Sequence, residues 1–325
     1  MSRGQWILLV LLVLQGGLLL IVAAPWSTGA GIDGTRVLVR ELGTVEPARI
    51  EIVEGDVTLS LQQQDGRWRI EQADGYPADA SKVERLIGDL EQIEVRRPVV
   101  SGSRYHEALK VTVDDNERRL RLWGSPDGEP AVELLIGSSP NYGVQHVRRR
   151  DEDRVYEVRG LSPWDLRADA GSWIDTTLLE VAAADVVSLR ITHGAEGFGL
   201  SREDGSEWHR SDGEAPVDPA KVDRFLETIE GLRVSEPAGP AGPAEQRASF
   251  GLDEPAAVLE LVHRPAENAT ETVTLRIGRA LDDDSGKRYA WVDGAEYAVV
   301  LSKWDAERVV DQRLESFAPD DDGDG

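Results

Sequence analysis

A glycine-rich stretch and a serine-containing stretch have residue types and spacing that could do chemistry. Gly29-Ala30-Gly31-Ile32-Asp33-Gly34 has the spacing of a dinucleotide-binding turn, in which a strand precedes the glycines and a helix follows them. Here an apolar segment precedes the glycines and residues 35–40 have a strand pattern, so we interpret the stretch as a flexible linker. Gly160-Leu161-Ser162-Pro163-Trp164 lacks the final glycine of the nucleophile elbow that carries a catalytic serine, so we interpret it as a structural helix start.

The candidate metal ligands and acid–base groups are histidines and acidic runs, because the chain has no cysteine. Asp282-Asp283-Asp284-Ser285-Gly286 and Asp320-Asp321-Asp322-Gly323-Asp324 could attract calcium, but both lack the glutamate that completes an EF-hand loop. No two histidines stand at ligand spacing; they are His106, His146, His193, His209 and His263. We therefore predict no catalytic, cofactor-binding or metal-binding residue, and no cofactor.

A basic run, Arg148-Arg149-Arg150, is followed directly by the acidic run Asp151-Glu152-Asp153. Because the two runs offset each other, we expect a charged hairpin tip between Val147 and Val155, with a phosphate site as the alternative. The whole chain has 36 basic and 60 acidic residues, a formal net charge of −24. A nucleic-acid binder needs a basic surface to displace counterions, so this composition argues against nucleic acid as a partner.

An uncharged apolar segment from Trp6 to Trp26 follows a single basic residue, Arg3. As a helix this segment would span about 30 Å, the thickness of a bilayer core, and its terminal tryptophans suit the two interfaces. Arg3 predicts a cytoplasmic N-terminus, with the rest of the chain outside. The alternative is a signal peptide cleaved near Ala24 or Ala30, and both interpretations export the same domain.

One sequence pattern occurs twice, about 140 residues apart. Trp68 corresponds to Trp208, and Asp79-Ala80-Ser81-Lys82-Val83 corresponds to Asp218-Pro219-Ala220-Lys221-Val222. Each pentapeptide opens a helix whose apolar positions have identical offsets and form one stripe, with the aspartate as its N-cap. The stripes are Val83, Leu86, Ile87, Leu90 and Ile93 in the first copy, and Val222, Phe225, Leu226, Ile229 and Leu232 in the second.

Alternating apolar residues after each helix predict antiparallel hairpins. In the first copy Leu109, Val111 and Val113 alternate before a turn at residues 114–116, and the second copy has a comparable pattern over residues 257–277. Both copies then show an Ile-Gly pair and a Leu-Ser-x-Trp-Asp pattern where a short helix is expected. These lie at 136–137 and 161–165 in the first copy, and at 277–278 and 301–305 in the second.

These patterns predict an α+β fold, with an N-terminal transmembrane helix followed by two tandem repeated modules, each an antiparallel sheet with one amphipathic helix. Residues 236–243, rich in proline and glycine, predict a surface loop. The matched tryptophans 68, 164, 208 and 304 are expected to anchor the two cores, with a carbohydrate-stacking surface as the alternative. The expected parts are a cytoplasmic N-terminus (1–5), an anchor (6–26), a linker (27–46), modules at 47–182 and 183–318, and a disordered acidic tail (319–325).

Three segments resemble the bacterial DUF4340 family of envelope proteins. They are Trp68-Arg69-Ile70, the stretch Pro77-Ala78-Asp79-Ala80-Ser81-Lys82-Val83, and Gly251-Leu252-Asp253-Glu254-Pro255-Ala256 before a strand. The first copy departs from this pattern, because Tyr105-His106-Glu107-Ala108-Leu109 stands in place of Phe-Gly-Leu-Asp. Members of this family are commonly encoded beside ABC-type transport components of the gliding-motility kind. The resemblance therefore implies an accessory role at an inner-membrane export or envelope complex.

We expect a non-catalytic accessory or scaffold protein in the periplasm, held in the bacterial inner membrane as a single-pass protein through residues 6–26. The resemblance implies ABC transporter permease or auxiliary subunits as partners. One alternative is a periplasmic ligand-binding module with a site between the two repeats, because interdomain clefts are common ligand sites. The others are an envelope hydrolase that uses paired carboxylates, and, for the location, secretion after signal cleavage.

Overall fold

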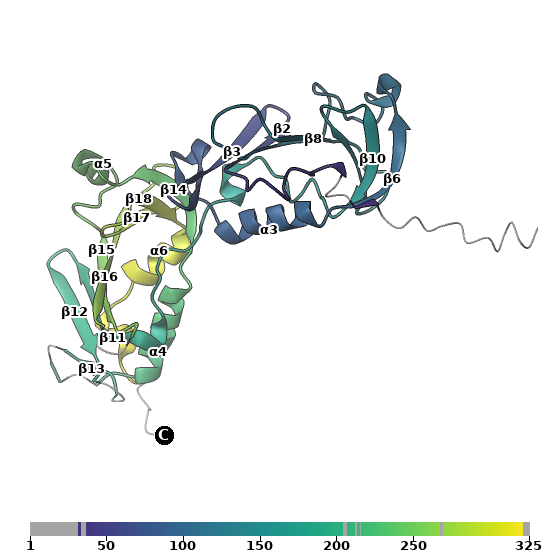
Figure 1. Cartoon of the computed structure of the whole chain (residues 1–325). Helices are drawn as coiled ribbons and strands as arrows, with labels where there is room; N and C mark the ends of the chain where they lie inside the picture. Colours follow the sequence, from purple (N-terminus) through teal and green to yellow (C-terminus); the bar gives the residue numbers. More distant parts are fainter. Residues whose placement is uncertain are drawn as a thin grey trace, which may run out of the picture. The chain divides into compact units, whose positions relative to one another are not determined.

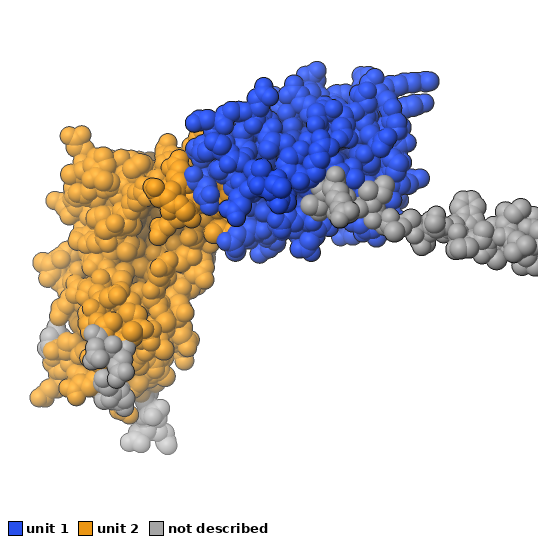
Figure 2. Space-filling model, viewed as in Figure 1, with its two compact units in different colours: residues 1–63, 81–169 blue, residues 64–80, 170–325 orange. Residues whose placement is uncertain are grey.

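The computed structural model describes residues 32–33, 37–203, 207–211, 213–214, 216–266 and 269–320. These residues form two compact units, coloured separately in Figure 2. Unit 1 holds the described residues of 1–63 together with 81–169, and unit 2 holds 64–80 together with those of 170–325. The predicted anchor at residues 6–26 lies outside the described residues. None of the described helices has the length and apolar character needed to cross a membrane.

Unit 1 is an antiparallel sheet with one amphipathic helix, α3 (Ala80–Glu91), running along one face (Figure 1). Its strands lie in the order β1-β6-β10-β9-β8-β7-β2-β3. In chain order they are β1 (Ile32–Asp33), β2 (Arg49–Glu54), β3 (Val57–Gln64), β6 (Glu94–Ser101), β7 (Arg118–Trp123), β8 (Val132–Ile136), β9 (Gln145–Arg149) and β10 (Arg154–Arg159).

Unit 2 contains a second antiparallel sheet, in the order β13-β12-β11-β15-β16-β17-β18-β14, and the small hairpin β4–β5. Its strands are β4 (Arg67–Ile70), β5 (Tyr76–Pro77), β11 (Val186–His193), β12 (Glu196–Ser201), β13 (His209–Arg210), β14 (Val234–Pro240), β15 (Ala257–His263), β16 (Glu271–Ala280), β17 (Arg288–Val292) and β18 (Tyr297–Leu301). Its helical elements include α4 (Pro219–Glu230), α5 (Ala244–Ser249), α6 (Lys303–Val310) and the 3-10 turn η5 (Leu314–Phe317).

The two sheets share one strand order, and both predicted amphipathic helices are confirmed. The order β6-β10-β9-β8-β7-β2-β3 corresponds strand by strand to β14-β18-β17-β16-β15-β11-β12. Both helices turn their apolar stripes inward, and Asp218 caps α4 by accepting a 2.9 Å hydrogen bond from the Ala220 N–H. The buried stripe residues are Val83, Leu86 and Leu90 in α3, and Val222, Phe225, Leu226 and Ile229 in α4.

The division into units differs from the predicted modules, 47–182 and 183–318. Residues 64–80 and 170–182 belong to unit 2, although the repeat pattern assigns them to the first module. Backbone hydrogen bonds within unit 2 account for the difference. The Asp79 N–H donates to the Trp173 carbonyl over 2.8 Å, and the Asp175 N–H donates to the Pro77 carbonyl over 2.9 Å.

The proline-rich segment at residues 236–243 begins as a strand, so the predicted surface loop was wrong up to Pro240. This strand, β14, pairs with β18, and its register shifts after Val234 and again after Pro237. Proline has no N–H to donate, but it is tolerated on an edge strand and at bulges. β14 is the last strand in its sheet, which is a position that composition alone does not reveal.

The alternating residues Leu109, Val111 and Val113 do not form the predicted hairpin strand. Lys110 has a φ of +54°, which breaks an extended backbone, and Val111 makes only an isolated bridge. Leu109 and Val111 pack instead against the sheet residue Leu135. The alternation therefore reflects a loop lying on the sheet, and the strand that follows is β7.

The repeated Ile-Gly pair marks the place where this loop crosses the sheet in each copy. A Cβ atom on Gly137 would lie 2.2 Å from the Leu109 carbonyl oxygen, and one on Gly278 would lie 2.2 Å from the Phe250 carbonyl oxygen. No side chain fits at either position. The crossing also shows which residues of the two copies correspond. Leu109-Lys110-Val111 in the first copy corresponds to Phe250-Gly251-Leu252 in the second.

The central residues of these two triplets have φ angles of +54° and +70°. The sequence pattern instead places Tyr105–Leu109 opposite the Phe-Gly-Leu-Asp of the second copy. That alignment was wrong because it did not allow for a lysine in the left-handed conformation that favours glycine.

Candidate functional site

Four tryptophans at matched positions divide into two buried and two exposed residues. Trp68 and Trp208 are 8% and 4% exposed, which confirms their prediction as core residues. Trp164 and Trp304 are 79% and 75% exposed, so the prediction that they anchor the cores was wrong. Each copy thus has one matched tryptophan that packs in the core and one that lies on the surface.

The Leu-Ser-x-Trp-Asp pattern explains why these indoles lie outside. Its leucine supplies the core contact, since Leu161 and Leu301 are both buried. In the second copy the pattern begins α6, as predicted: the Ser302 hydroxyl accepts a 3.1 Å hydrogen bond from the Asp305 N–H. Trp304 follows on the solvent side of this first turn. In the first copy, residues 161–165 form turns rather than the predicted helix.

Exposed indoles held on ordered backbone are candidates for protein–protein contact. Each offers a large, stiff apolar surface that loses little side-chain entropy when it is covered. Tryptophan is also enriched among the residues that dominate binding energy at interfaces. Trp164 in unit 1 and Trp304 in unit 2 are therefore the candidate interaction residues of their respective units.

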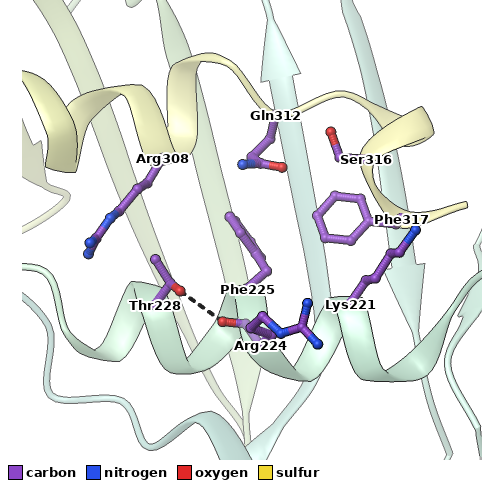
Figure 3. A pocket seen from close by; sticks show the side chains of 8 residues that line it. All are labelled: Lys221, Arg224, Phe225, Thr228, Arg308, Gln312, Ser316 and Phe317. Atoms are coloured by element: carbon purple, nitrogen blue, oxygen red, sulfur yellow. Dashed lines mark hydrogen bonds between the residues drawn. The ribbon is translucent and has the colours of Figure 1, made fainter.

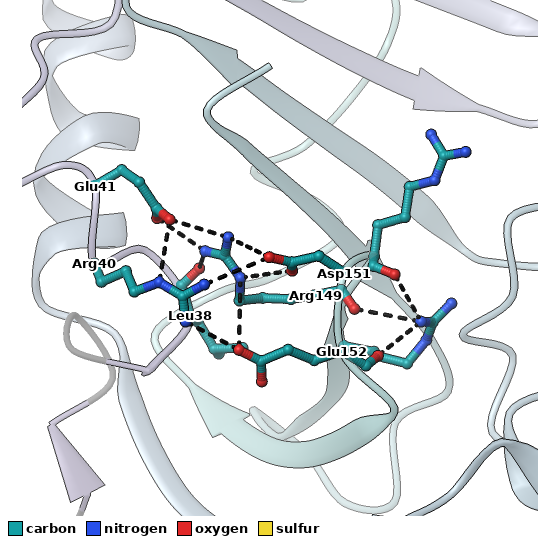
Figure 4. Close-up of polar contacts among 8 residues, drawn as sticks. Leu38, Arg40, Glu41, Arg149, Asp151 and Glu152 are labelled. Atoms are coloured by element: carbon teal, nitrogen blue, oxygen red, sulfur yellow. Dashed lines mark hydrogen bonds and ion pairs between the residues drawn. The ribbon is translucent and has the colours of Figure 1, made fainter. Parts of the chain in front are cut away.

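The arginine run at residues 148–150 is part of the internal structure. The hairpin predicted around it is confirmed as β9–β10, but the Arg149 side chain points inward and is only 4% exposed. Its guanidinium donates to the Leu38 carbonyl and to both carboxylate oxygens of Glu41 and of Asp151, over 2.8–3.2 Å (Figure 4). A buried charge is tolerated when its donors are satisfied in this way.

Arg148 is also buried, and its partners are carbonyl oxygens. It donates to the Val111 carbonyl over 2.8 Å and to the Glu152 carbonyl over 2.9 Å, closing the tip of the hairpin. Burial lowers the pKa of Arg148 below its ordinary value. Arg150 is the exposed member of the run, and it pairs with Glu133 over 3.1 Å. The phosphate-site interpretation is thus not supported for the two inward arginines.

The Arg149 cluster holds the segment from residue 37 to residue 44 on unit 1. The sequence predicted a strand up to residue 40 here, within the linker 27–46. The described residues form turns instead, with the Leu42 N–H donating to the Val39 carbonyl over 2.9 Å. Leu38 and Val39 are fully buried, because the arginine draws this segment onto the sheet.

Among the described residues, two serine–histidine hydrogen bonds each connect the two sides of a hairpin, and the sequence did not predict either of them. Ser138 Oγ lies 3.0 Å from His146 Nδ1, and Ser201 Oγ lies 3.2 Å from His209 Nε2. Each pair is eight residues apart in sequence, a spacing that one hairpin brings together. The hairpins could therefore have been the signal, once their register was known.

Neither pair is completed into a catalytic triad among the described residues. Glu157 lies opposite His146 on β10, but both its oxygens accept hydrogen bonds from Arg97, over 2.9 and 2.6 Å. This bonding with Arg97 holds the pKa of Glu157 below its usual range, while burial lowers the pKa of His146. The contact of His146 with Ser138 is therefore a packing contact within the sheet region.

The acidic groups show no arrangement that would hold a metal ion within the described part of the chain. In the 282–286 run, Asp283 accepts hydrogen bonds from the backbone N–H and the hydroxyl of Ser285, as a solvated turn does. The terminal run is described only as far as Asp320. Partial desolvation and then the charge of Asp89 raise the pKa of Asp165, which is an exposed residue beside Trp164.

A cavity of about 310 Å³ lies in unit 2 between α4, α6 and η5 (Figure 3). Its wall combines three cations, two phenylalanines and three neutral polar side chains. These residues are Lys221, Arg224, Arg308, Phe225, Phe317, Thr228, Gln312 and Ser316. No local sequence pattern indicates this pocket, because its cations come from separate elements that only the fold brings together.

Comparison with known proteins gives a family for most of the chain. No curated protein and no solved structure matches it. The family described as "Domain of unknown function (DUF4340)" matches residues 68–243 and 210–320. These two overlapping matches together span residues 68–320, which confirms the resemblance found in the repeated segments. The chain belongs to the DUF4340 family.

Proposed function

We propose that this chain is a non-catalytic, membrane-anchored accessory or scaffold protein of the bacterial periplasm, which docks partner proteins through Trp164 and Trp304. The observation that carries the proposal is the exposure of both indoles at equivalent positions of a repeated pattern, 79% and 75%. We also infer that the two sheets derive from one duplicated module, since their strand orders correspond. A duplicated module with a retained exposed residue presents the same docking chemistry twice.

The size of the expected effect follows from the area of an indole. A tryptophan buries about 150–250 Å² when it is covered, and apolar area contributes roughly 25 cal/mol per Å². Only part of this appears as binding energy, because association costs entropy. A central interface tryptophan commonly contributes about 2 kcal/mol, which corresponds to roughly a 30-fold change in Kd.

The internal use of the candidate chemical groups supports a non-catalytic role. The guanidinium groups of Arg148 and Arg149 donate their hydrogen bonds to the hairpin tip and to residues 38–41. The serine–histidine pairs lie across hairpins as packing contacts. The ligand-binding and hydrolase alternatives stay predictions.

The proposed location rests on the sequence. Residues 6–26 would hold the chain in the inner membrane as a single span, with the N-terminus in the cytoplasm and the bulk in the periplasm. Secretion after cleavage is the alternative. The proposed partners, ABC transporter permease or auxiliary subunits, rest on the family resemblance.

Co-purification from membranes solubilised in mild detergent tests the proposal. The tagged full chain should recover transporter or envelope subunits, and the double variant Trp164→Ala/Trp304→Ala should lose them. Lys303→Ala is the matched control, because it alters the exposed residue beside Trp304 on the same turn. Circular dichroism should show all three chains equally folded. Recovery of the same partners by the double variant, or a solitary wild-type protein, would contradict the proposal.

A further inference from the structure

The cavity between α4, α6 and η5 has a charge opposite to that of the molecule. Three cations line it and no acidic residue does, although the chain has 60 acidic and 36 basic residues. Lys221 and Arg224 are three residues apart on α4, so they project from one face of the helix. Arg308 comes from α6 on the opposite wall.

Among the cations of this pocket, Arg224 is the one without a partner in the described part of the chain. Arg308 is partly neutralised by Asp305, which lies 3.4 Å away on its own helix. Lys221 donates hydrogen bonds to Ala318 and Asp320. Arg224 is exposed, and within the described part of the chain its guanidinium makes no hydrogen bond or salt bridge.

The floor of the pocket is rigid and aromatic. Phe225 and Phe317 are buried, and their rings meet edge to face with centroids 5.4 Å apart. Figure 3 shows Phe225 rising from α4 toward the opposite segment, and Lys221 beside Phe317 at one end. The exposed Arg224 side chain beside this floor can turn toward an incoming anion.

A peptide carboxylate already binds at this end of the pocket. Lys221 Nζ donates to the Asp320 carboxylate over 2.6 Å and to the Ala318 carbonyl over 2.8 Å. The hydrogen bond and charge of Lys221, and further the charge of Arg224, hold the pKa of Asp320 below its usual range. Asp320 is 83% exposed, so its contact is weak and replaceable.

We infer that this pocket binds an acidic peptide segment of a partner protein, and that Asp320 competes for the same cations. A peptide is favoured because Lys221 binds a main-chain carbonyl and a carboxylate of one segment, and a peptide offers both groups. Arg224 supplies the charge for a second carboxylate. The site is independent of the proposed docking role of Trp164, which lies in unit 1.

Fluorescence anisotropy with the full chain in detergent tests this inference. The probe is a labelled peptide, Ala-Pro-Asp-Asp-Asp-Gly-Asp, and its control replaces each Asp with Asn. We expect saturable binding of the acidic peptide alone, weakened by added salt because the contacts are ionic. Arg224→Gln should weaken binding about tenfold, the loss of one charge-assisted contact. Asp320→Asn should strengthen it several-fold by removing the competitor.

Arg85→Gln is the matched control, since Arg85 holds the corresponding position on α3 and should leave binding unchanged. Trp164→Ala should also leave it unchanged, so failure of the docking proposal and failure of this one are distinguishable. Equal affinity of the wild type, Arg224→Gln and Asp320→Asn chains would overturn the inference. So would binding of inorganic phosphate at this site without binding of the peptide, which would make it a small-anion site.

Discussion

At the scale of single residues, similar side chains have opposite roles in this chain. Arg149 is buried and bonded on every side, whereas Arg150, the next residue, is exposed and pairs with Glu133. β9 ends at Arg149, and Arg150 lies in the turn that follows, where its side chain reaches solvent. Sequence composition treats the run as one basic patch, but the end of the strand decides which arginines are buried in the fold.

Arg149→Ala should therefore lower the free energy of unfolding of unit 1 by about 3 kcal/mol. The substitution leaves the Leu38 carbonyl without its donor and the Glu41 and Asp151 carboxylates with only the exposed Arg40 as a cation among the described residues. Urea unfolding followed by circular dichroism measures the loss. Arg167→Ala is the control and should cost less than about 1 kcal/mol, because both partners of its ion pair with Asp169 are exposed. Equal losses for the two variants would refute the role of Arg149.

At the scale of elements, the helices could be predicted and several connections could not. The stripe and cap of α4 are local patterns, so residues within a few positions determine them. β14 and the loop at residues 109–113 depend on distant partners. Prolines are tolerated in β14 because it is an edge strand, and Leu109 and Val111 of the loop pack on the face of the sheet. Periodicity reports that a residue is covered, but not which element covers it.

The candidate sites could not be predicted from the sequence for the same reason. Trp164 and Trp304 repeat as faithfully as the buried Trp68 and Trp208, so repetition alone does not separate packing from exposure. The pocket in unit 2 needs α4 and α6 to face each other, and no motif signals that. The signal that could have separated the tryptophans is the buried leucine three residues earlier in Leu-Ser-x-Trp-Asp. This leucine already fills the core position at that turn, so the tryptophan is left exposed.

Two glycine substitutions in unit 1 should change stability in opposite directions. Gly137→Ala should lower the free energy of unfolding by at least about 2 kcal/mol, since its Cβ would meet the Leu109 carbonyl oxygen at 2.2 Å. Gly88→Ala should raise it by about 0.5–1 kcal/mol, because α3 has open space there and alanine favours helix. Urea midpoints of both variants measure the effects. A harmless Gly137→Ala would contradict the close crossing of loop and strand.

At the scale of the whole molecule, net charge opposes folding while local pairs support it. A formal charge of −24 at pH 7 repels itself most strongly in the compact state. The described ion pairs, such as Arg97 with Glu157, offset this only locally. Salt screens the diffuse repulsion over about 8 Å at physiological ionic strength, and buried pairs are screened less. We therefore expect added salt to stabilise the fold by screening the repulsion of the net charge.

The apparent Tm of the full chain at pH 7 should rise by about 2–4 °C when sodium chloride is added to a low-salt buffer, a gain of roughly 1 kcal/mol. The same addition near pH 4.6, the isoelectric point, should give almost no gain, because the net repulsion is already absent there. Thermal scans in the two buffers, in the same detergent, make the comparison. An equal gain in apparent Tm at both pH values would show that salt acts through a general effect on protein hydration and not by screening the net charge. A loss at pH 7 would show that local ion pairs, and not the net charge, dominate the electrostatics of this molecule.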